Sequence, residues 1–209
     1  MSIRAAAAAF LVLSSACPGL ARSAPPDDGP SPDPRLVAML GAAVPSKRCF
    51  VRRYDARHLA RHPRQKVKAM RLLVYTAHTD EEKTRVGYHF GLSAAVRDRK
   101  GTLFSAGECR YYDGVQGRNM PVLCARDCDR GSFGLEVEPP YRSVLLRLGS
   151  ANEKGTRFDR PGSLGMNSAC DADEADSYEL VSGADDRSFR LEAAPLAACR
   201  EVSKWLEQP

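Results

Sequence analysis

The stretch VGYHFGLSAAV, residues 86–96, decides the fold class of this chain. Its even-numbered positions are all apolar, from Val86 and Tyr88 through Phe90 to Val96, and the positions between them are small or polar. Successive side chains of a strand point to opposite faces, so an alternation of period two over eleven residues indicates a strand with one buried face.

Shorter alternating segments raise the expected number of strands to about seven, and they cover residues 70–76, 102–109, 132–138, 144–148, 178–181 and 188–191. The last two enclose Gly183-Ala-Asp-Asp186, which predicts a hairpin turn. The connections are short and no long helices alternate with the strands. We therefore expect a mainly β fold with antiparallel strands, either a barrel or a sandwich.

Short helices are expected at both ends of a single mostly-β domain over residues 35–209. The first helix is expected to begin at Asp33-Pro34, since aspartate caps a helix and proline fits its first turn. It is expected to end at Gly41, since glycine often follows the last helical residue. A second helix is predicted from Asp55 to the residue before Pro63. The C-terminal helix begins at Pro195, and we expect its apolar stripe to pack on the sheet; that stripe is Leu196, Cys199, Val202 and Leu206.

Residues 1–24 have the pattern of a secretory signal peptide. Arg4 precedes an apolar run over residues 5–13, and small residues follow the run. This run is shorter than the roughly 20 apolar residues that span a bilayer. Cleavage between Ala21 and Ala24 is therefore expected to release a periplasmic or secreted protein that begins with a proline-rich linker over residues 25–34.

Cys17 leaves a second interpretation of the N-terminus open. Leu13-Ser-Ser-Ala-Cys17 loosely matches the lipobox of bacterial lipoproteins, although Ser14 stands where that motif has an aliphatic residue. The alternative is therefore a lipoprotein anchored through Cys17.

The six later cysteines are predicted to form disulfides, because export places them in an oxidising compartment. Cys109 and Cys124 flank a loop and are expected to bridge a hairpin. The pair Cys49 and Cys199 is expected to tie the two ends of the domain together. Cys128 and Cys170 remain, and they are expected to pin two irregular segments.

The net charge argues against a nucleic-acid partner. The chain has 31 Lys and Arg against 26 Asp and Glu. Removal of residues 1–24 takes away only Arg4 and Arg22, which leaves 29 basic against 26 acidic residues. A nucleic-acid-binding domain is usually far more basic.

Basic residues are nevertheless concentrated between Lys47 and Arg71. Ten of these 25 residues are Lys or Arg, and Asp55 is the one acid among them. The second predicted helix places Arg57 and Arg61 on one face, with Arg53 and Arg64 beyond its ends. This pattern predicts an anion-binding face for an anionic lipid, an acidic polysaccharide or an acidic protein. The alternative is a solvated helix whose arginines pair with acids elsewhere in the fold.

No motif in the sequence predicts a catalytic residue, a metal or a cofactor. His58 and His62 have the i, i+4 spacing of zinc ligands, but Leu59 occupies the place of a metalloprotease glutamate. The acidic stretch 171–176 lacks the glycine of a calcium loop. No phosphate-binding loop, dinucleotide fingerprint or nucleophile elbow is present. Two functions other than binding remain open. One is a hydrolase-like enzyme that uses His78, His89 or His58, and the other is a structural role in the envelope.

Three segments resemble a group of small exported proteins of Gram-negative bacteria. They are Cys124–Ser132 with its CxxxCDxGS pattern, Ala184–Leu191 and Ala198–Arg200. The resemblance covers roughly residues 50–209. It implies export, but it implies no activity, ligand or catalytic residue.

Overall fold

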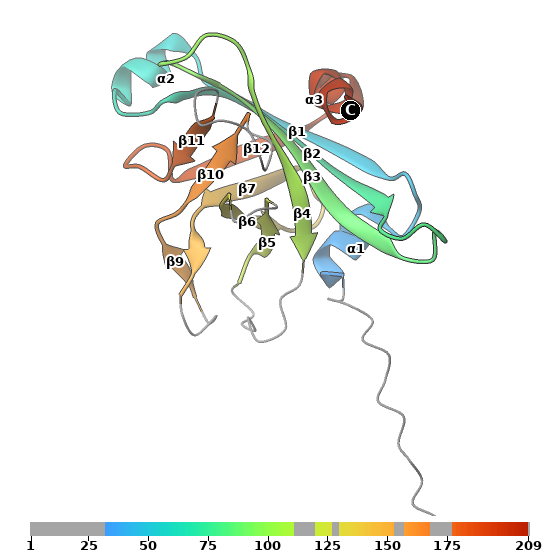
Figure 1. Cartoon of the computed structure of the whole chain (residues 1–209). Helices are drawn as coiled ribbons and strands as arrows, with labels where there is room; N and C mark the ends of the chain where they lie inside the picture. The colour runs from blue at the N-terminus through green and yellow to red at the C-terminus, as the bar shows by residue number, and fades with distance from the viewer. Residues whose placement is uncertain (1–31, 111–119, 127–129, 153–156, 168–176, 209) are drawn as a thin grey trace, which may run out of the picture.

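The computed structural model describes residues 32–110, 120–126, 130–152, 157–167 and 177–208 (Figure 1). The predicted signal peptide, Cys17 and the linker up to residue 31 lie outside these ranges. The same holds for Cys128 and Cys170 of the third predicted disulfide, and for the acidic stretch 171–176.

Eight antiparallel strands form a closed barrel. In barrel order they are β1 (Lys47–Arg53), β12 (Ser188–Ala194), β7 (Ser143–Leu148), β6 (Ser132–Val137), β5 (Val122–Ala125), β4 (Leu103–Arg110), β3 (Val86–Val96) and β2 (Val67–His78). Because β1 pairs with both β2 and β12, the sheet has no free edge. The predicted mainly β, antiparallel class is confirmed, and the architecture is a barrel and not a sandwich.

Four short strands lie between β7 and β12 in the chain. They are β8 (Ser150–Ala151), β9 (Phe158–Arg160), β10 (Ser163–Met166) and β11 (Tyr178–Val181), and they form two separate two-stranded sheets. The predicted hairpin between residues 178–181 and 188–191 is wrong, because β11 pairs with β10 while β12 pairs with β1 and β7. Both edges of β12 are needed to close the barrel, so none is left for β11.

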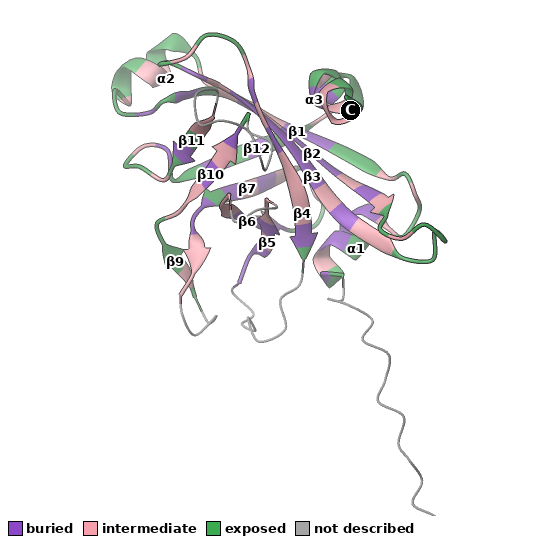
Figure 2. Ribbon diagram, in the orientation of Figure 1, coloured by how far each residue is buried: buried purple, intermediate pink, exposed green. Residues whose placement is uncertain are grey.

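Buried apolar residues of the barrel strands form one core cluster, and Figure 2 shows buried residues along these strands. Phe50, Phe90, Phe133 and Phe189 come from four different strands and are fully buried. The rings of Phe90 and Phe133 meet edge to face, with their centroids 4.8 Å apart. The inward positions of β3 are the even-numbered ones, as the alternation in residues 86–96 predicts.

Helix α1 (Pro34–Leu40) packs its apolar residues into one end of the barrel core. Leu36 and Met39 are buried there, and the Asp33 side chain caps the helix by accepting a hydrogen bond from the Arg35 amide. Gly41 ends it with φ of 73°, a backbone conformation that favours glycine. The Tyr88 hydroxyl donates to the Gly41 carbonyl at 3.0 Å and fixes the helix to β3.

The C-terminal segment lies on the outside of the barrel against β1, β2 and β3 (Figure 1). It consists of the 3₁₀ helix η2 (Leu196–Cys199) and helix α3 (Arg200–Leu206). Val202 and Cys199 pack with Cys49 and Leu73 in a second core cluster. A Cβ on Gly91 would lie 2.7 Å from Val202 Cγ1, so this close approach of α3 to β3 requires glycine.

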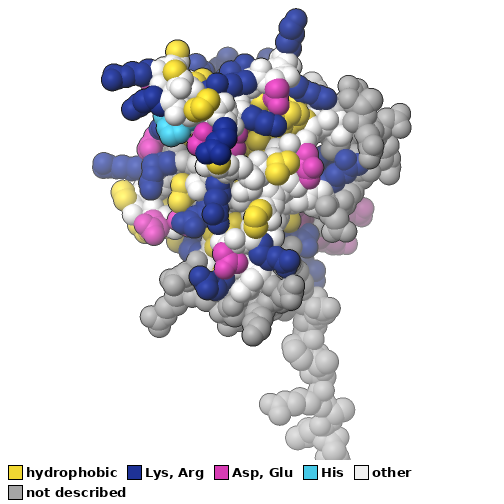
Figure 3. All heavy atoms as spheres, turned by 90° about the vertical axis from the view of Figure 1, so that its left-hand side faces the viewer, with side chains coloured by type: hydrophobic (Ala, Val, Ile, Leu, Met, Phe, Trp, Pro, Cys, Tyr) yellow, Lys and Arg dark blue, Asp and Glu magenta, His cyan; other side chains and the backbone are white. Residues whose placement is uncertain are grey.

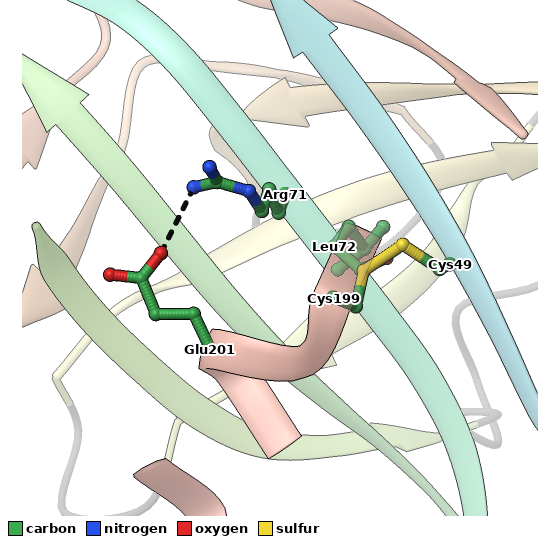
Figure 4. The surroundings of a disulfide bond; sticks show 5 residues. All are labelled: Cys49, Arg71, Leu72, Cys199 and Glu201. Carbon is green, nitrogen blue, oxygen red and sulfur yellow. Dashed lines mark hydrogen bonds and ion pairs between the residues drawn. A yellow bond between two sulfur atoms is a disulfide. The ribbon is translucent and has the colours of Figure 1, made fainter. Parts of the chain in front are cut away.

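Two disulfides join the described strands and helices. Cys49 on β1 bonds Cys199 at the end of η2, and the Arg71–Glu201 ion pair at 3.3 Å holds α3 beside it (Figure 4). Cys109 and Cys124 face each other across β4 and β5. These are two of the three pairs that the sequence predicts. Among the described residues, no helix is both long and apolar enough to cross a membrane.

Candidate anion-binding face

Helix α2 (Ala56–Arg61) lies at the barrel end opposite α1 (Figure 1). The Asp55 side chain accepts a hydrogen bond from the His58 amide at 2.7 Å and so caps its N-terminus. At the other end, the Arg97 guanidinium donates to the carbonyl oxygens of Leu59 and His62 at 2.6 and 3.2 Å. These contacts satisfy backbone groups at both helix ends and fix α2 to the turn after β3.

The four predicted arginines are all exposed around this helix. Arg53 ends β1, Arg57 and Arg61 lie on α2, and Arg64 lies in the turn that follows. None of the four side chains forms an ion pair or a hydrogen bond with another described residue. We call Arg53, Arg57, Arg61 and Arg64 the cationic face. Figure 3 views the molecule from this side and shows Lys and Arg side chains over its upper part and further down the same face, with Asp and Glu side chains among them.

A stacked column of planar side chains lies beside the cationic face. The Arg52 guanidinium carbon is 4.7 Å from the Tyr54 ring centroid. The Tyr54 and His58 centroids are 4.6 Å apart, and those of His58 and His62 are 4.4 Å apart. Asp185, in the turn before β12, ends the column with its Oδ1 3.6 Å from His62 Nδ1.

Sequence reasoning found the spacing of the two histidines but not this column. Tyr54, His58 and His62 recur every fourth residue, which places aromatic rings above one another where the chain is helical. That spacing is the signal that could have indicated the stack.

The buried Gln65 determines which nitrogen of His58 carries a hydrogen. Gln65 Nε2 donates to the Val67 carbonyl at 2.7 Å, so its Oε1 faces His58 Nε2 at 3.0 Å. Only a protonated Nε2 can donate to that oxygen. In the neutral ring Nδ1 is then the nitrogen that is open to a further proton.

The zinc interpretation of the two histidines has no geometric support. His58 Nε2 is engaged by Gln65, and the two rings lie face to face. In the part of the chain that the structure describes, no group of three or more His, Cys, Asp and Glu side chains could hold a metal ion.

Acidic groups lie near the column, and the charge of one of them, Asp186, acts on Tyr54. The buried Asp186 accepts hydrogen bonds from the Lys66 and Val67 amides. Desolvation raises the pKa of Asp186, although the two amide donors act in the opposite direction. Nearby, Lys66 pairs with Asp98 at 3.5 Å, and the Tyr178 hydroxyl donates to Asp98 at 3.2 Å. Burial, followed by the Asp98 charge, raises the pKa of Tyr178 to about 12.

Asp186 predicts a pH-dependent contribution to stability. Its pKa in the folded chain is raised above the ordinary value of 3.8, so the folded state binds the proton more tightly than the unfolded state. This contribution is present at low pH and is lost as pH rises from about 4 through the folded pKa. The measured quantity is the difference in free energy of unfolding between wild type and Asp186→Asn, determined by denaturant titration. We expect this difference to fall as pH rises from 4 to 6. The exposed Asp159→Asn is the control, and a difference independent of pH would refute the expectation.

The other two histidines lie on β2 and β3, away from α2 in the chain. His78 is exposed at the end of β2. His89 on β3 stacks on Tyr75 of β2, with ring centroids 5.4 Å apart, and stands opposite Glu108 of β4. Burial and the Glu108 charge raise the pKa of Tyr75. Tyr75 and His89 stand at odd-numbered positions of their strands, which face away from the barrel core.

Comparisons with protein-family models, curated proteins and solved structures found no match to this chain. The interpretation of the cationic face therefore rests on its residues and their geometry.

Proposed function

We propose that this chain is an exported envelope protein that binds a partner carrying closely spaced anionic groups through the cationic face. The observation that carries the proposal is the exposure of Arg53, Arg57, Arg61 and Arg64 without a described carboxylate partner. The two disulfides support export, because such bonds persist in oxidising compartments. The product is periplasmic or secreted, with anchoring through Cys17 as the alternative.

Arginine defines the chemistry of the partner. A guanidinium group presents a planar fork of donors that matches a phosphate or a carboxylate. Four such groups around one short helix fit a surface or polymer on which these anions repeat, such as an anionic lipid layer or an acidic polysaccharide.

The contact is electrostatic and does not insert into a membrane. Amphipathic helices that enter a bilayer carry large apolar side chains on one face. The large apolar residues that are exposed in the described ranges are Val37, Val181 and Leu196, and none belongs to α2.

Changing Arg57 and Arg61 together to glutamine is expected to weaken binding about 10- to 30-fold at low salt, since each cation near an anionic surface contributes roughly 1 kcal/mol. Binding is measured by cosedimentation with phosphatidylglycerol vesicles and, separately, by titration with polygalacturonate. The two probes distinguish a lipid surface from a polysaccharide. The melting temperature is expected to change little, because exposed charges contribute little to folding.

Arg142→Gln combined with Arg200→Gln is the matched control. Both residues are exposed and lie outside the cationic face, so the control loses the same charge elsewhere. We expect it to retain most of the binding, and wild-type binding should fall steeply as salt rises. Equal losses in the two double variants would show that net charge, and not this face, causes binding. Absence of binding to both probes would reject the proposal.

A further inference from the structure

We propose that protonation of His58 and His62 strengthens anion binding at the cationic face, so that binding tightens as pH falls below neutrality. The inference rests on the proposed function, since it names the regulation of the same site. Its structural basis is the column Arg52–Tyr54–His58–His62, which is continuous over three stacking contacts.

The column places two titratable rings on the helix that carries two permanent cations. His58 lies on α2 and His62 caps its C-terminus, and Arg57 and Arg61 of the cationic face belong to the same helix. Histidine changes charge between about pH 5 and 8. Protonation of these two rings therefore adds positive charge to the helix that carries Arg57 and Arg61.

Asp185 is the acidic residue that faces His62. Its carboxylate lies 3.6 Å from His62 Nδ1, and its side chain is 18% exposed. When His62 is neutral, Asp185 leaves a negative charge beside the column, which repels an anionic partner. A proton on His62 cancels that charge.

Other charged groups of both signs lie in the segments around the column. The cations are Arg97, which donates to the His62 carbonyl, and Arg57 and Arg61 of α2. The acids are Asp55 at the N-terminus of α2, Asp186 beside Asp185, and Asp98, which pairs with Lys66. At His58 the proton enters at Nδ1, because Nε2 already donates to Gln65. A bound anion adds negative charge and so favours both protons.

The test measures binding of the full chain to phosphatidylglycerol vesicles at pH 8 and pH 5 and at one low ionic strength. The lipid phosphodiester remains ionised at both values, so the vesicle charge is constant. Each added cation near such a surface increases affinity about fivefold. Repulsion between the two rings reduces the sum, and we expect wild-type affinity to rise roughly tenfold at pH 5.

Replacing both rings, as His58→Gln with His62→Gln, is expected to abolish the rise, so that the affinities of this variant at pH 8 and at pH 5 become equal. His78→Gln is the matched control, because His78 is exposed and lies outside the column, and this variant should keep the full rise. Asp185→Asn should increase affinity at pH 8, since it removes the negative charge without acid. If the double variant does not fold, His62→Gln alone is used, since its side chain is 43% exposed, and it should lose about half of the rise on a logarithmic scale.

Each outcome has a distinct meaning. Wild-type binding that is equal at both pH values overturns the inference and leaves the proposed function intact. A rise that persists in the double variant overturns it as well, because other groups then cause the effect. Absence of binding to the vesicles at both pH values, together with absence of binding to polygalacturonate, rejects the proposed function and the inference.

Discussion

Replacing Cys49 and Cys199 together by alanine is expected to lower the free energy of unfolding by about 4–5 kcal/mol. The bond closes a loop of 150 residues, and in the chain-entropy model a crosslink over so long a loop restricts the unfolded chain strongly. It also holds η2 and α3 against the outside of β1, β2 and β3, where Cys199 and Val202 are fully buried. Equilibrium denaturation of the oxidised wild type and the double variant measures the difference.

Replacing Cys109 and Cys124 by alanine is the internal comparison. That bond spans 15 residues and joins strands that are already paired, so we expect a smaller loss of about 3 kcal/mol. A larger loss for this pair than for Cys49–Cys199 would contradict the account based on loop length.

Replacing Phe90 by alanine is expected to cost about 3–5 kcal/mol of folding stability. The ring is fully buried at the centre of the barrel and meets Phe133 edge to face. It also fills space left by Gly107 on β4, where a Cβ would lie 2.9 Å from Phe90 Cε1. Neighbours on paired strands cannot move inward to fill the resulting cavity, so the loss stays close to the upper part of the range.

The control for this prediction is Val181→Ala. Val181 is 55% exposed on β11, and its truncation should change stability by less than about 0.5 kcal/mol. Both variants are measured by denaturant unfolding at one pH. A loss below about 2 kcal/mol for Phe90→Ala would mean that the barrel core rearranges around the missing ring.

The sequence predicts β3 to the residue but misses β1, and the reason is physical. Both strands alternate, but the inward positions of β1 on either side of Phe50 are Arg48 and Arg52. They lie at the two ends of the barrel, where a long side chain can leave the core. Arg48 donates to the Met39 carbonyl at 3.0 Å, and Arg52 stacks on Tyr54. Phe50 is therefore the one apolar residue among these three inward positions of β1, and the alternation that predicts a strand does not show in the sequence.

Some features of the candidate site depend on neighbouring residues in the sequence, and others depend on contacts between distant segments. The cap of α2 and the spacing of Arg57 and Arg61 are properties of neighbouring residues, and the sequence predicts them. The contact of His62 with Asp185 joins segments more than one hundred residues apart, and it exists only because β12 returns to pair with β1. No local pattern carries that information.

The place of β12 between β1 and β7 also constrains how the chain matures. Until residues 188–194 are available, β1 and β7 each present a row of unpaired backbone groups, and such edges invite association with other chains. The barrel therefore cannot close while its C-terminal strand is still being synthesised. The contacts that close it join the two ends of the domain, which is the arrangement that makes folding slow.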